Sequence, residues 1–308
     1  MSENTVGGRY ERQVVALGVA AGYGAGNPAC QDGPAVLRAM GFLDDLEAAR
    51  DGFRWEPPIR LETPGVIDRL AAVTSIATRL AERVGALLAA GNFPLVIGGD
   101  HSCAIGTWSG AKQFLGGHAP EARLGLLWVD AHMDSHTFRT SPSRNIHGMP
   151  LAALLGQGEP RLTAIAGPAP QLLPADACLL GVRSFERGEA ELLASLGVRV
   201  YFMDEIKRRG LPEVFAEARA RVCANTVGYG ISIDLDALDP DEEPGVGTPV
   251  PDGLHRRELV DVLRLAHCDA RLLALEIVEY NPYLDAGFAT AQAIHDLCRS
   301  LLEPCASI

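Results

Sequence analysis

Short apolar runs and amphipathic stretches alternate along most of the chain. Seven runs are dominated by apolar side chains, which is typical of strands buried on both faces of a sheet. They are Val14–Val19, Pro94–Ile97, Leu124–Val129, Cys178–Val182, Val198–Phe202, Val227–Ile233 and Arg271–Ile277. Other segments repeat apolar residues every three or four positions, as on one face of a helix. Such helices are predicted over Pro64–Gly91, Glu186–Leu196, Leu211–Ala224, Arg256–His267 and Ala289–Leu302.

Glycine and proline mark several boundaries in this pattern. The long helix Pro64–Gly91 ends where Gly91 is followed by Asn, a common way for a helix to stop. Pro34 lies near the first position of another predicted helix, where its fixed backbone angle is favourable. The segment Gly156–Pro174 is rich in glycine and proline and is predicted to be a surface loop.

The alternation of strands and helices predicts an α/β fold with a mostly parallel sheet and helices on both faces. The sequence contains neither an internal repeat nor a linker, so we expect a single domain over residues 1–308. Ligands of open α/β sheets bind beyond the carboxyl ends of the strands. Those ends are therefore the first place to look for chemistry.

Acidic and histidine side chains follow four of the predicted strands. The segments are GGDHS at 98–102, DAHMD at 130–134, DLD at 234–236 and EYNP at 279–282. Because the carboxyl ends of parallel strands meet at one edge of a sheet, we expect these segments to lie close together.

The spacing within the segments predicts a metal site. Residues two apart in an extended chain share a face, so the acids and histidines of DAHMD and DLD can point the same way. The candidate ligands are His101, Asp130, His132, Asp134, Asp234 and Asp236. Four carboxylates at close range repel one another unless cations neutralise them. Carboxylates and imidazoles without a thiolate favour ions such as Mn²⁺, and two such ions can hold a nucleophilic hydroxide.

Each segment has a simpler explanation when it is taken alone. A strand end can carry solvated capping acids, and a histidine at a helix start can be structural. The conjunction of the segments at successive strand ends favours metal binding. Asp100 and Asp239 are expected to be supporting or capping groups. The remaining histidines without acidic partners at ligand spacing are expected to be structural; they are His118, His255, His267 and His295.

Together, these residues resemble the arginase–agmatinase (ureohydrolase) family. The matching segments are GGDHS (98–102), DAHMD (130–134), SIDLDALDP (232–240), GTP (247–249) and EYNP (279–282), in the order of that family. The resemblance extends from near Val14 to Pro282. It implies a three-layer α/β/α domain, two Mn²⁺ per subunit at the edge of a parallel sheet, and a homo-oligomer, either a trimer or a hexamer.

Residues 143–150, SRNIHGMP, resemble arginases more than agmatinases. By this match, Ser143 helps to hold the substrate carboxylate and His147 is a proton shuttle. Glu279 matches the acid that pairs with the guanidinium group, and Thr248 matches a hydroxyl on the pocket floor. The implied reaction converts L-arginine, a small cationic guanidino compound, to L-ornithine and urea.

Two positions depart from the arginase pattern. Arginases usually carry Asn two residues after the last ligand of DAHxD, where this chain has His136. They also place an Asp pair after the fourth strand, where this chain has Ser184 and Glu186. Glu186 can still accept the substrate ammonium, since it is only one methylene longer. His136 and Glu186 are thus expected to contact the amino-acid end of the substrate.

The expected mechanism follows from the chemistry of guanidinium, which is a poor electrophile. A hydroxide that bridges the two metal ions attacks the central carbon. Glu279 orients the guanidinium group through charge-assisted hydrogen bonds. Asp134 hands the proton of the hydroxide to the departing nitrogen, and His147, expected to titrate near neutrality, relays protons to water.

The sequence leaves other functions open. Agmatine, guanidinobutyrate and formiminoglutamate are alternative substrates, and the last would need a cationic contact such as Arg139 or Arg144. A non-catalytic binding protein of this fold would be expected to have lost metal ligands, and none is lost. A dinuclear phosphoesterase would need a cationic clamp for the phosphoryl group, and none is present near the ligands.

Composition narrows the partners. The net charge is −12, from 27 Lys and Arg against 39 Asp and Glu. No basic cluster stands out, so neither nucleic acid nor an anionic membrane is expected as a partner. No apolar run approaches the roughly 18 residues of a membrane span, and no signal-peptide pattern is present at the start. The seven cysteines are scattered without a CxxC pair, which indicates a reducing, cytoplasmic compartment rather than a disulfide framework.

Overall fold

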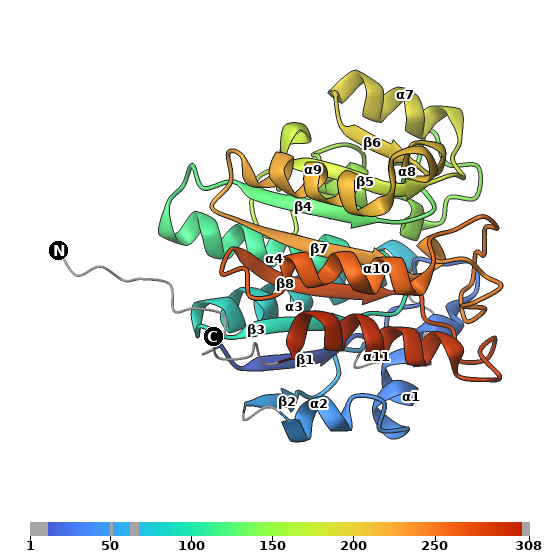
Figure 1. Cartoon of the computed structure of the whole chain (residues 1–308). Helices are drawn as coiled ribbons and strands as arrows, with labels where there is room; N and C mark the ends of the chain where they lie inside the picture. The colour runs from blue at the N-terminus through green and yellow to red at the C-terminus, as the bar shows by residue number, and fades with distance from the viewer. Residues whose placement is uncertain (1–11, 50–51, 62–67, 304–308) are drawn as a thin grey trace.

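Eight parallel strands form one sheet in the computed structural model, which describes residues 12–49, 52–61 and 68–303 (Figure 1). The strands are β1 (Val14–Gly18), β2 (Phe53–Trp55), β3 (Phe93–Ile97), β4 (Leu124–Val129), β5 (Ala177–Val182), β6 (Arg199–Phe202), β7 (Gly228–Asp234) and β8 (Leu272–Val278). Their order across the sheet is β2-β1-β3-β8-β7-β4-β5-β6, and every neighbouring pair is parallel.

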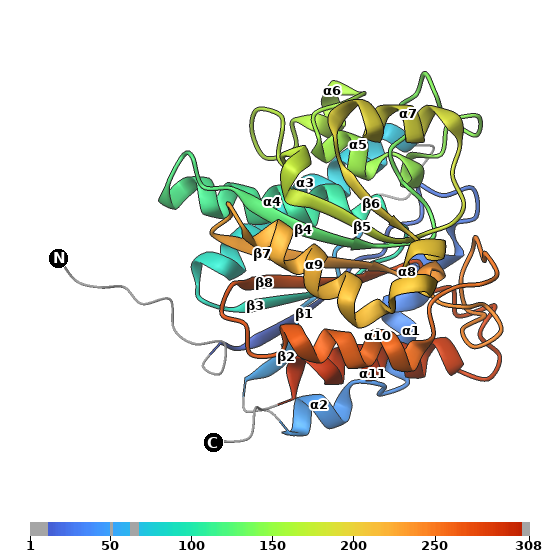
Figure 2. The same ribbon diagram turned by 45° about the horizontal axis from the view of Figure 1, so that its top comes forward.

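Helices cover both faces of this sheet (Figures 1 and 2). One layer consists of α1 (Gly33–Ala39), α2 (Asp44–Ala49), α8 (Met203–Arg209), α9 (Leu211–Cys223), α10 (Arg256–Leu263) and α11 (Ala289–Leu302). The other consists of α3 (Arg69–Ala89), α4 (Cys103–His118), α5 (Pro150–Leu154) and α7 (Arg187–Leu196). The short α6 (Pro160–Thr163) packs with α3 and α5. The predicted three-layer α/β/α fold is confirmed.

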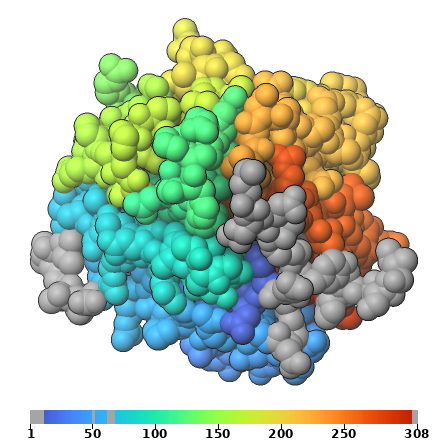
Figure 3. All heavy atoms as spheres, turned by 90° about the vertical axis from the view of Figure 1, so that its left-hand side faces the viewer, coloured from blue at the N-terminus to red at the C-terminus, as the bar shows by residue number. Residues whose placement is uncertain are grey.

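Figure 3 shows the molecule from the end at which the strands begin, with the α3–α4 layer in cyan and green on one side and the orange segments on the other. Successive residues of each strand point to opposite layers. On β4, Leu127 and Val129 join one apolar core, whereas Leu126 and Trp128 join the other. Because the strand is buried on both faces, its sequence is continuously apolar.

Helices α3 and α4 approach closely where small residues face one another. A Cβ on Gly106 would lie 2.6 Å from the carbonyl oxygen of Ala77, and one on Gly110 would lie 2.3 Å from that of Ala81. Only glycine allows the two backbones to come this close. The contact fixes α4, which begins two residues after His101, against the rest of its layer.

The predicted strands are all present, and each end lies within one residue of its expected position. The start of the predicted helix Pro64–Gly91 lies outside the described residues; the helix is described from Arg69. Six of these strands and α-helices were not predicted; they are β2, α2, α4, α5, α6 and α8. The edge strand β2 is only three residues long, and α4 is buried over most of its surface, so neither shows a clear periodicity.

The expectation of a surface loop over Gly156–Pro174 is partly wrong. Residues Pro160–Thr163 form α6, and Leu162 and Leu172 are buried.

The free cysteines Cys30, Cys103, Cys178 and Cys298 are buried and Cys223 is partly buried, whereas Cys268 is disulfide-bonded. None of the helices in the described part of the chain combines the length and apolar character that crossing a membrane requires.

Candidate active site

The four motif-bearing strands are neighbours in the sheet. The order β3-β8-β7-β4 places their carboxyl ends side by side, so the segments at 98–102, 279–282, 234–236 and 130–134 meet at one edge. The convergence that the sequence predicted is therefore a consequence of strand order.

The candidate metal ligands form two adjacent groups. His101, Asp130, Asp134 and Asp234 make one group, and Asp130, His132 and Asp236 make the other. Within each group the potential ligand atoms all lie within 4.8 Å of one another. Asp130 belongs to both groups, so the arrangement suits two cations that share one carboxylate.

The ring of His101 provides a test of whether cations fit. His101 is fully buried, and its Nδ1 lies 3.0 Å from Asp134, 3.1 Å from Asp234 and 3.3 Å from Asp130. Among the described residues, Nδ1 has no partner with hydrogen-bond geometry. A buried ring nitrogen that faces three carboxylates without bonding to them is costly unless a cation lies between. These residues fit a divalent metal, and their oxygen and imidazole donors suit Mn²⁺.

The far side of the His101 ring explains why Nδ1 is free to bind a cation. Its Nε2 lies 3.1 Å from the Ser232 hydroxyl, which donates to Glu276 over 2.7 Å. Since that hydroxyl donates its proton to Glu276, it accepts from Nε2–H, and the Nδ1 lone pair points at the carboxylates. Sequence reasoning missed Ser232 and Glu276. A glutamate inside an apolar strand was the available signal for Glu276.

The carboxylates of the site crowd one another. Burial, and then the charge of Asp130, raises the pKa of Asp134 to about 6. Burial, with Asp236 and Asp130 nearby, raises the pKa of Asp234 well above its ordinary value. Asp134 and Asp234 therefore resist ionisation, and positive charge from bound cations would favour their charged forms.

Thr248 and His132 meet at Asp236. His132 Nδ1 lies 3.1 Å from Asp236 Oδ2, and the Thr248 hydroxyl donates to the same oxygen over 2.8 Å. Thr248 also lines the pocket. Through its hydrogen bond, Thr248 can help to hold Asp236, a candidate ligand.

Asp134 and Glu279 both have a left-handed backbone. Their φ angles are 46° and 67°, a region that non-glycine residues rarely adopt and that costs about 1–3 kcal/mol. Each follows the end of a strand, β4 or β8. Residues held in such conformations cluster at functional sites, because the surrounding structure must maintain them.

Glu279 pairs with His147 beside the candidate metal ligands. Its Oε1 accepts hydrogen bonds of 2.9 Å from the backbone N–H of His101 and from Nδ1 of His147. Burial alone would lower the pKa of His147, but the charge and hydrogen bond of Glu279, together with Asp100 and Asp134, raise that pKa to about 10. The expectation that His147 titrates near neutrality is therefore wrong for this pairing, because the sequence did not show that the two residues touch.

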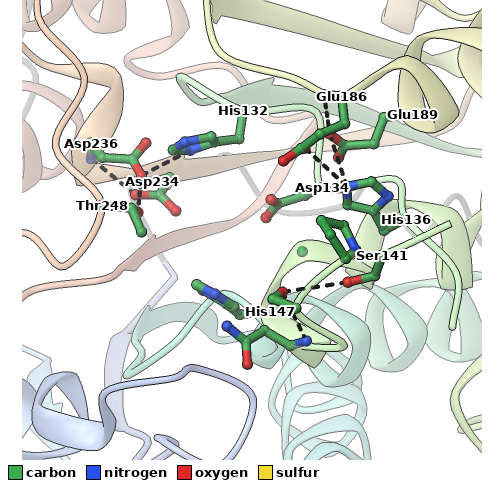
Figure 4. A pocket seen from close by; sticks show the side chains of 14 residues that line it. His132, Asp134, His136, Ser141, His147, Glu186, Glu189, Asp234, Asp236 and Thr248 are labelled. Carbon is green, nitrogen blue, oxygen red and sulfur yellow. Dashed lines mark hydrogen bonds and ion pairs between the residues drawn. The ribbon is translucent and has the colours of Figure 1, made fainter.

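A pocket of about 160 Å³ opens above these residues (Figure 4). It is lined by His132, Asp134, His136, Ser141, Pro142, Ser143, Asn145, His147, Gly148, Glu186, Glu189, Asp234, Asp236 and Thr248. No lysine or arginine belongs to this lining. Arg139 and Arg144 are exposed outside it, and Arg144 lies over the ring of Phe138.

His136 and Glu186, the two departures from the arginase pattern, contact each other. Nε2 of His136 lies 3.0 Å from Glu186 Oε2 and 3.3 Å from Glu189 Oε2, and Nδ1 lies 3.1 Å from the Thr140 hydroxyl. In Figure 4, His136, Glu186 and Glu189 lie across the pocket from His132 and Asp236. Burial raises the pKa of Glu189 to about 8. Sequence reasoning missed Glu189, although its spacing from Glu186 is that of a capping box at a helix start.

Ser143 stands at the exposed rim of the pocket. Its hydroxyl accepts a hydrogen bond of 3.2 Å from the backbone N–H of Asn145 and lies 3.5 Å from the hydroxyl of Ser141. Ser141 and Asn145 also line the pocket and were not predicted. The loop that bears Ser143 and His147 therefore contributes four polar side chains.

Several other polar residues lie outside the pocket. Asp100 accepts from the backbone N–H groups of Gly24 and Ser102, and Asp239 from those of Asp241 and Gly253, as expected of supporting groups. His255 and His295 lie outside the pocket lining, although each has an acidic partner that its sequence neighbourhood does not show. The fold brings His255 to Glu242 and His295 to Asp45, which are distant in sequence.

Comparison with known proteins decides the family. A profile of the arginase family matches residues 12–303. The chain belongs to the arginase family. It is 41% identical to an arginase of Bacillus caldovelox over 278 residues, covering 87% of this chain and 91% of that one. It is 39% identical to an arginase of Brevibacillus brevis over 292 residues, or 92% and 96% of the two chains.

Solved structures agree. The crystal structure of an arginase from Bacillus subtilis matches with a TM-score of 0.86 at 35% identity, over 94% of this chain and 98% of that one. A formimidoylglutamase from Bacillus subtilis matches at 21% identity with a TM-score of 0.76, which shows the shared fold alone. This arginase-family chain is a hydrolase that acts on guanidino C–N bonds.

Proposed function

We propose that the chain hydrolyses L-arginine to L-ornithine and urea with two Mn²⁺ ions per subunit. The observation that carries this proposal is the meeting of two cation-binding groups with Glu279 and His147 below one pocket. Its 41% identity to an arginase of Bacillus caldovelox supports the choice of substrate. From the resemblance to the arginase–agmatinase family we also propose a homo-oligomer, a trimer or a hexamer.

The six predicted ligands would hold the two ions, and Asp130 would contact both. When bound, two divalent ions supply a nucleophile from water at neutral pH. The chain's own contribution is to fix the ligand atoms. Ser232 and Glu276 set the ring of His101, and Thr248 sets Asp236.

Glu279 would bind and orient the guanidinium group. The residue is only 3% exposed, and burial raises the pKa of its carboxyl group, but the positive charge of His147 outweighs burial and lowers that pKa. A buried, ionised acid accepts strong hydrogen bonds from guanidinium N–H groups. Because His147 occupies Oε1 in this structure, the incoming cation replaces or shares that partner.

Asp134 and His147 would move the protons. Asp134 lies beside His101 and lines the pocket, so its carboxyl group can carry a proton to the departing nitrogen. His147 reaches the solvent side, with about a fifth of its side chain exposed, and can pass protons between the pocket and water.

The outer end of the pocket would hold the amino-acid part of the substrate. Glu186 would accept the α-ammonium, and the hydroxyl of Ser143 would donate to the carboxylate. His136 has both ring nitrogens engaged within the protein, so we assign it to holding Glu186 rather than to a direct substrate contact.

Agmatine is the second candidate substrate. The pocket lining contains Glu186 and Glu189 but neither lysine nor arginine, which suits an ammonium without a carboxylate. Formiminoglutamate is disfavoured, because Arg139 and Arg144 do not belong to the lining. A role in binding alone is disfavoured as well, since every candidate ligand is in place.

A substrate panel tests the proposal. Protein loaded with Mn²⁺ is incubated with L-arginine, agmatine, 4-guanidinobutyrate and formiminoglutamate, and urea, formamide and bound metal are measured. We expect urea and ornithine from L-arginine at the highest kcat/KM, with two metal ions per chain. Faster release of urea from agmatine would replace the assigned substrate, and a metal-loaded protein without turnover would refute the activity.

A further inference from the structure

The backbone of Gly24 links two parts of the active site. Its N–H donates over 2.7 Å to Oδ2 of Asp100, the residue that precedes His101 in the sequence. Its carbonyl accepts from the backbone N–H groups of Ile146, at 2.8 Å, and of His147, at 3.3 Å. One residue thus connects the end of β3, which carries a candidate metal ligand, to the loop that carries His147.

The connection is tight on the β3 side. A Cβ on Gly24 would lie 2.6 Å from Asp100 Oδ1 and 2.9 Å from the hydroxyl oxygen of Ser102. No other residue fits without displacing Asp100. Asp100 and Ser102 therefore fix the position of Gly24 on the side of β3. A separate contact is needed to fix Gly24 relative to the loop that carries His147.

Arg69, the first residue of α3, makes that contact. Its Nε donates to the carbonyl of Tyr23 at 2.8 Å, and its Nη2 to those of Gly24 at 3.0 Å and Ala25 at 2.7 Å. The same Nη2 lies 3.1 Å from Oδ1 of Asn145. Each of these four hydrogen bonds goes to a carbonyl oxygen, of the backbone or of the Asn145 amide.

The contact to Asn145 also orients its amide. Arginine has donors but no acceptor, so Oδ1 of Asn145 must face Arg69 and its NH₂ group must face away. Asn145 lines the pocket and lies two residues before His147. Arg69 therefore binds both segments that meet at the Gly24 carbonyl, residues 23–25 and the loop that contains Asn145.

We propose that Arg69 is a positioning residue of the active site. By tying residues 23–25 to Asn145, it keeps His147 within hydrogen-bond reach of Glu279. The inference rests on the proposed function for its kinetic consequence, but not for its structural one. Lysine cannot replace it fully, because a single ammonium group lacks the planar fork that spans several carbonyls.

Hydrogen exchange of the full-length, Mn²⁺-loaded protein tests the structural part. We expect R69A to speed exchange about tenfold or more at the amides of Ile146 and His147, since loss of charge-assisted hydrogen bonds weakens the local fold. R69K should lie between R69A and the unchanged protein. The matched control is R79A on the same helix, whose Nη1 donates to the carbonyl of Arg60; it should leave exchange at residues 145–149 unchanged.

Turnover tests the kinetic part. A misplaced acid–base group loses much of its contribution, so we expect kcat of R69A to fall about 10- to 100-fold with an altered pH profile. R79A should keep the original profile. R69K keeps an aliphatic side chain and a positive charge at this position. If R69A does not fold, R69K therefore still tests the role of the guanidinium group.

The outcomes separate the two proposals. Native exchange at residues 145–149 in both R69A and R69K would overturn the positioning role, whatever the activity. If R69A or R69K shows faster amide exchange at residues 145–149 but an unchanged kcat and pH profile, Arg69 has no effect on catalysis. If the unchanged protein releases no urea while R69A alters exchange as expected, the proposed function fails and the structural role of Arg69 stands.

Discussion

Single side chains in this site owe their charge to particular neighbours. Glu279 and His147 share a hydrogen bond of 2.9 Å, and each stabilises the charged form of the other. His136 is held between Glu186 and the hydroxyl of Thr140. The predictions at this scale therefore change one partner and observe the other.

Glu279→Gln and His132→Ala separate orientation from metal binding. We expect E279Q to lose at least about 10²-fold in turnover, because the amide no longer pairs ionically with guanidinium, while its Mn²⁺ content is retained. H132A should lose both metal and turnover. Elemental analysis beside a urea assay measures the two effects. Near-full activity of E279Q would refute the orienting role of Glu279.

The His147–Glu279 pair predicts a pH dependence. Although burial opposes the shift, Glu279, with Asp100 and Asp134 nearby, raises the pKa of His147 from 6.5 to about 10. A raised pKa contributes stability that is complete below pH 6.5 and is lost as the pH rises through about 10. In E279Q, burial without the counter-charge should lower the pKa of His147, which NMR titration of its ring can follow. An unchanged pKa in that variant would show that the two side chains do not pair in solution.

The contact between His136 and Glu186 predicts coupled effects on substrate binding. If His136 holds Glu186 in place, H136A and E186Q should each raise KM for L-arginine about tenfold, with a small effect on kcat. The double variant should then be little worse than either single variant, because both changes remove one interaction. Steady-state kinetics of the four proteins form the cycle. Additive losses would mean that the residues act separately.

At the scale of elements, strand order and helix packing place the site. The neighbours β3, β8, β7 and β4 deliver all the candidate ligands to one edge. Asp134 after β4 and Glu279 after β8 both have a left-handed backbone, and the side chain of Asp134 lines the pocket. Helix α4 begins beside His101 and is held by its glycine contacts to α3. Substitutions that push α3 and α4 apart should therefore lower the free energy of unfolding.

Two glycines of α4 provide a matched test. G110A should destabilise the protein by about 1–3 kcal/mol, because its Cβ would meet the carbonyl of Ala81. G117A, on the same helix with open space around it, should be neutral or stabilise by about 0.5–1 kcal/mol. Urea unfolding measures both values. A G110A protein as stable as the parent would mean that α3 and α4 can move apart at little cost.

At the scale of the whole molecule, the buried carboxylates set a condition for stability. Asp130, Asp134, Asp234 and Asp236 lie within two overlapping groups at the sheet edge, and each is 7% exposed or less. Like charges packed together oppose folding unless cations compensate. The stability of the chain should thus depend on divalent ions.

Removal of metal should lower the melting temperature, and Mn²⁺ should restore it. A ligand that binds only the folded state adds about 2.7 kcal/mol at a concentration of 100 Kd. Calorimetry of chelated and reloaded protein measures the difference, and H132A is the control, since it should gain less from added Mn²⁺. Identical melting with and without metal would contradict the assigned ligands.

Much of the fold could be predicted because its determinants are local or periodic. Continuous apolar runs such as Leu124–Val129 identify strands buried on both faces, and the motif residues follow them directly. Helix α4 could not be predicted, since it is buried on most sides and lacks an amphipathic pattern. Glu276 was missed for a related reason: its partners Ser232 and Trp108 come from other elements.

The sequence by itself determined which residue types follow each strand, and so the metal chemistry and the family resemblance, because those motifs are contiguous. Only the tertiary structure decided which side chains touch: the sharing of Asp130 between two groups, the pairing of His147 with Glu279, the contact of His136 with Glu186, and the grip of Arg69 on Gly24. These contacts join residues far apart in the chain. Their distances depend on strand order and packing, which no local pattern encodes.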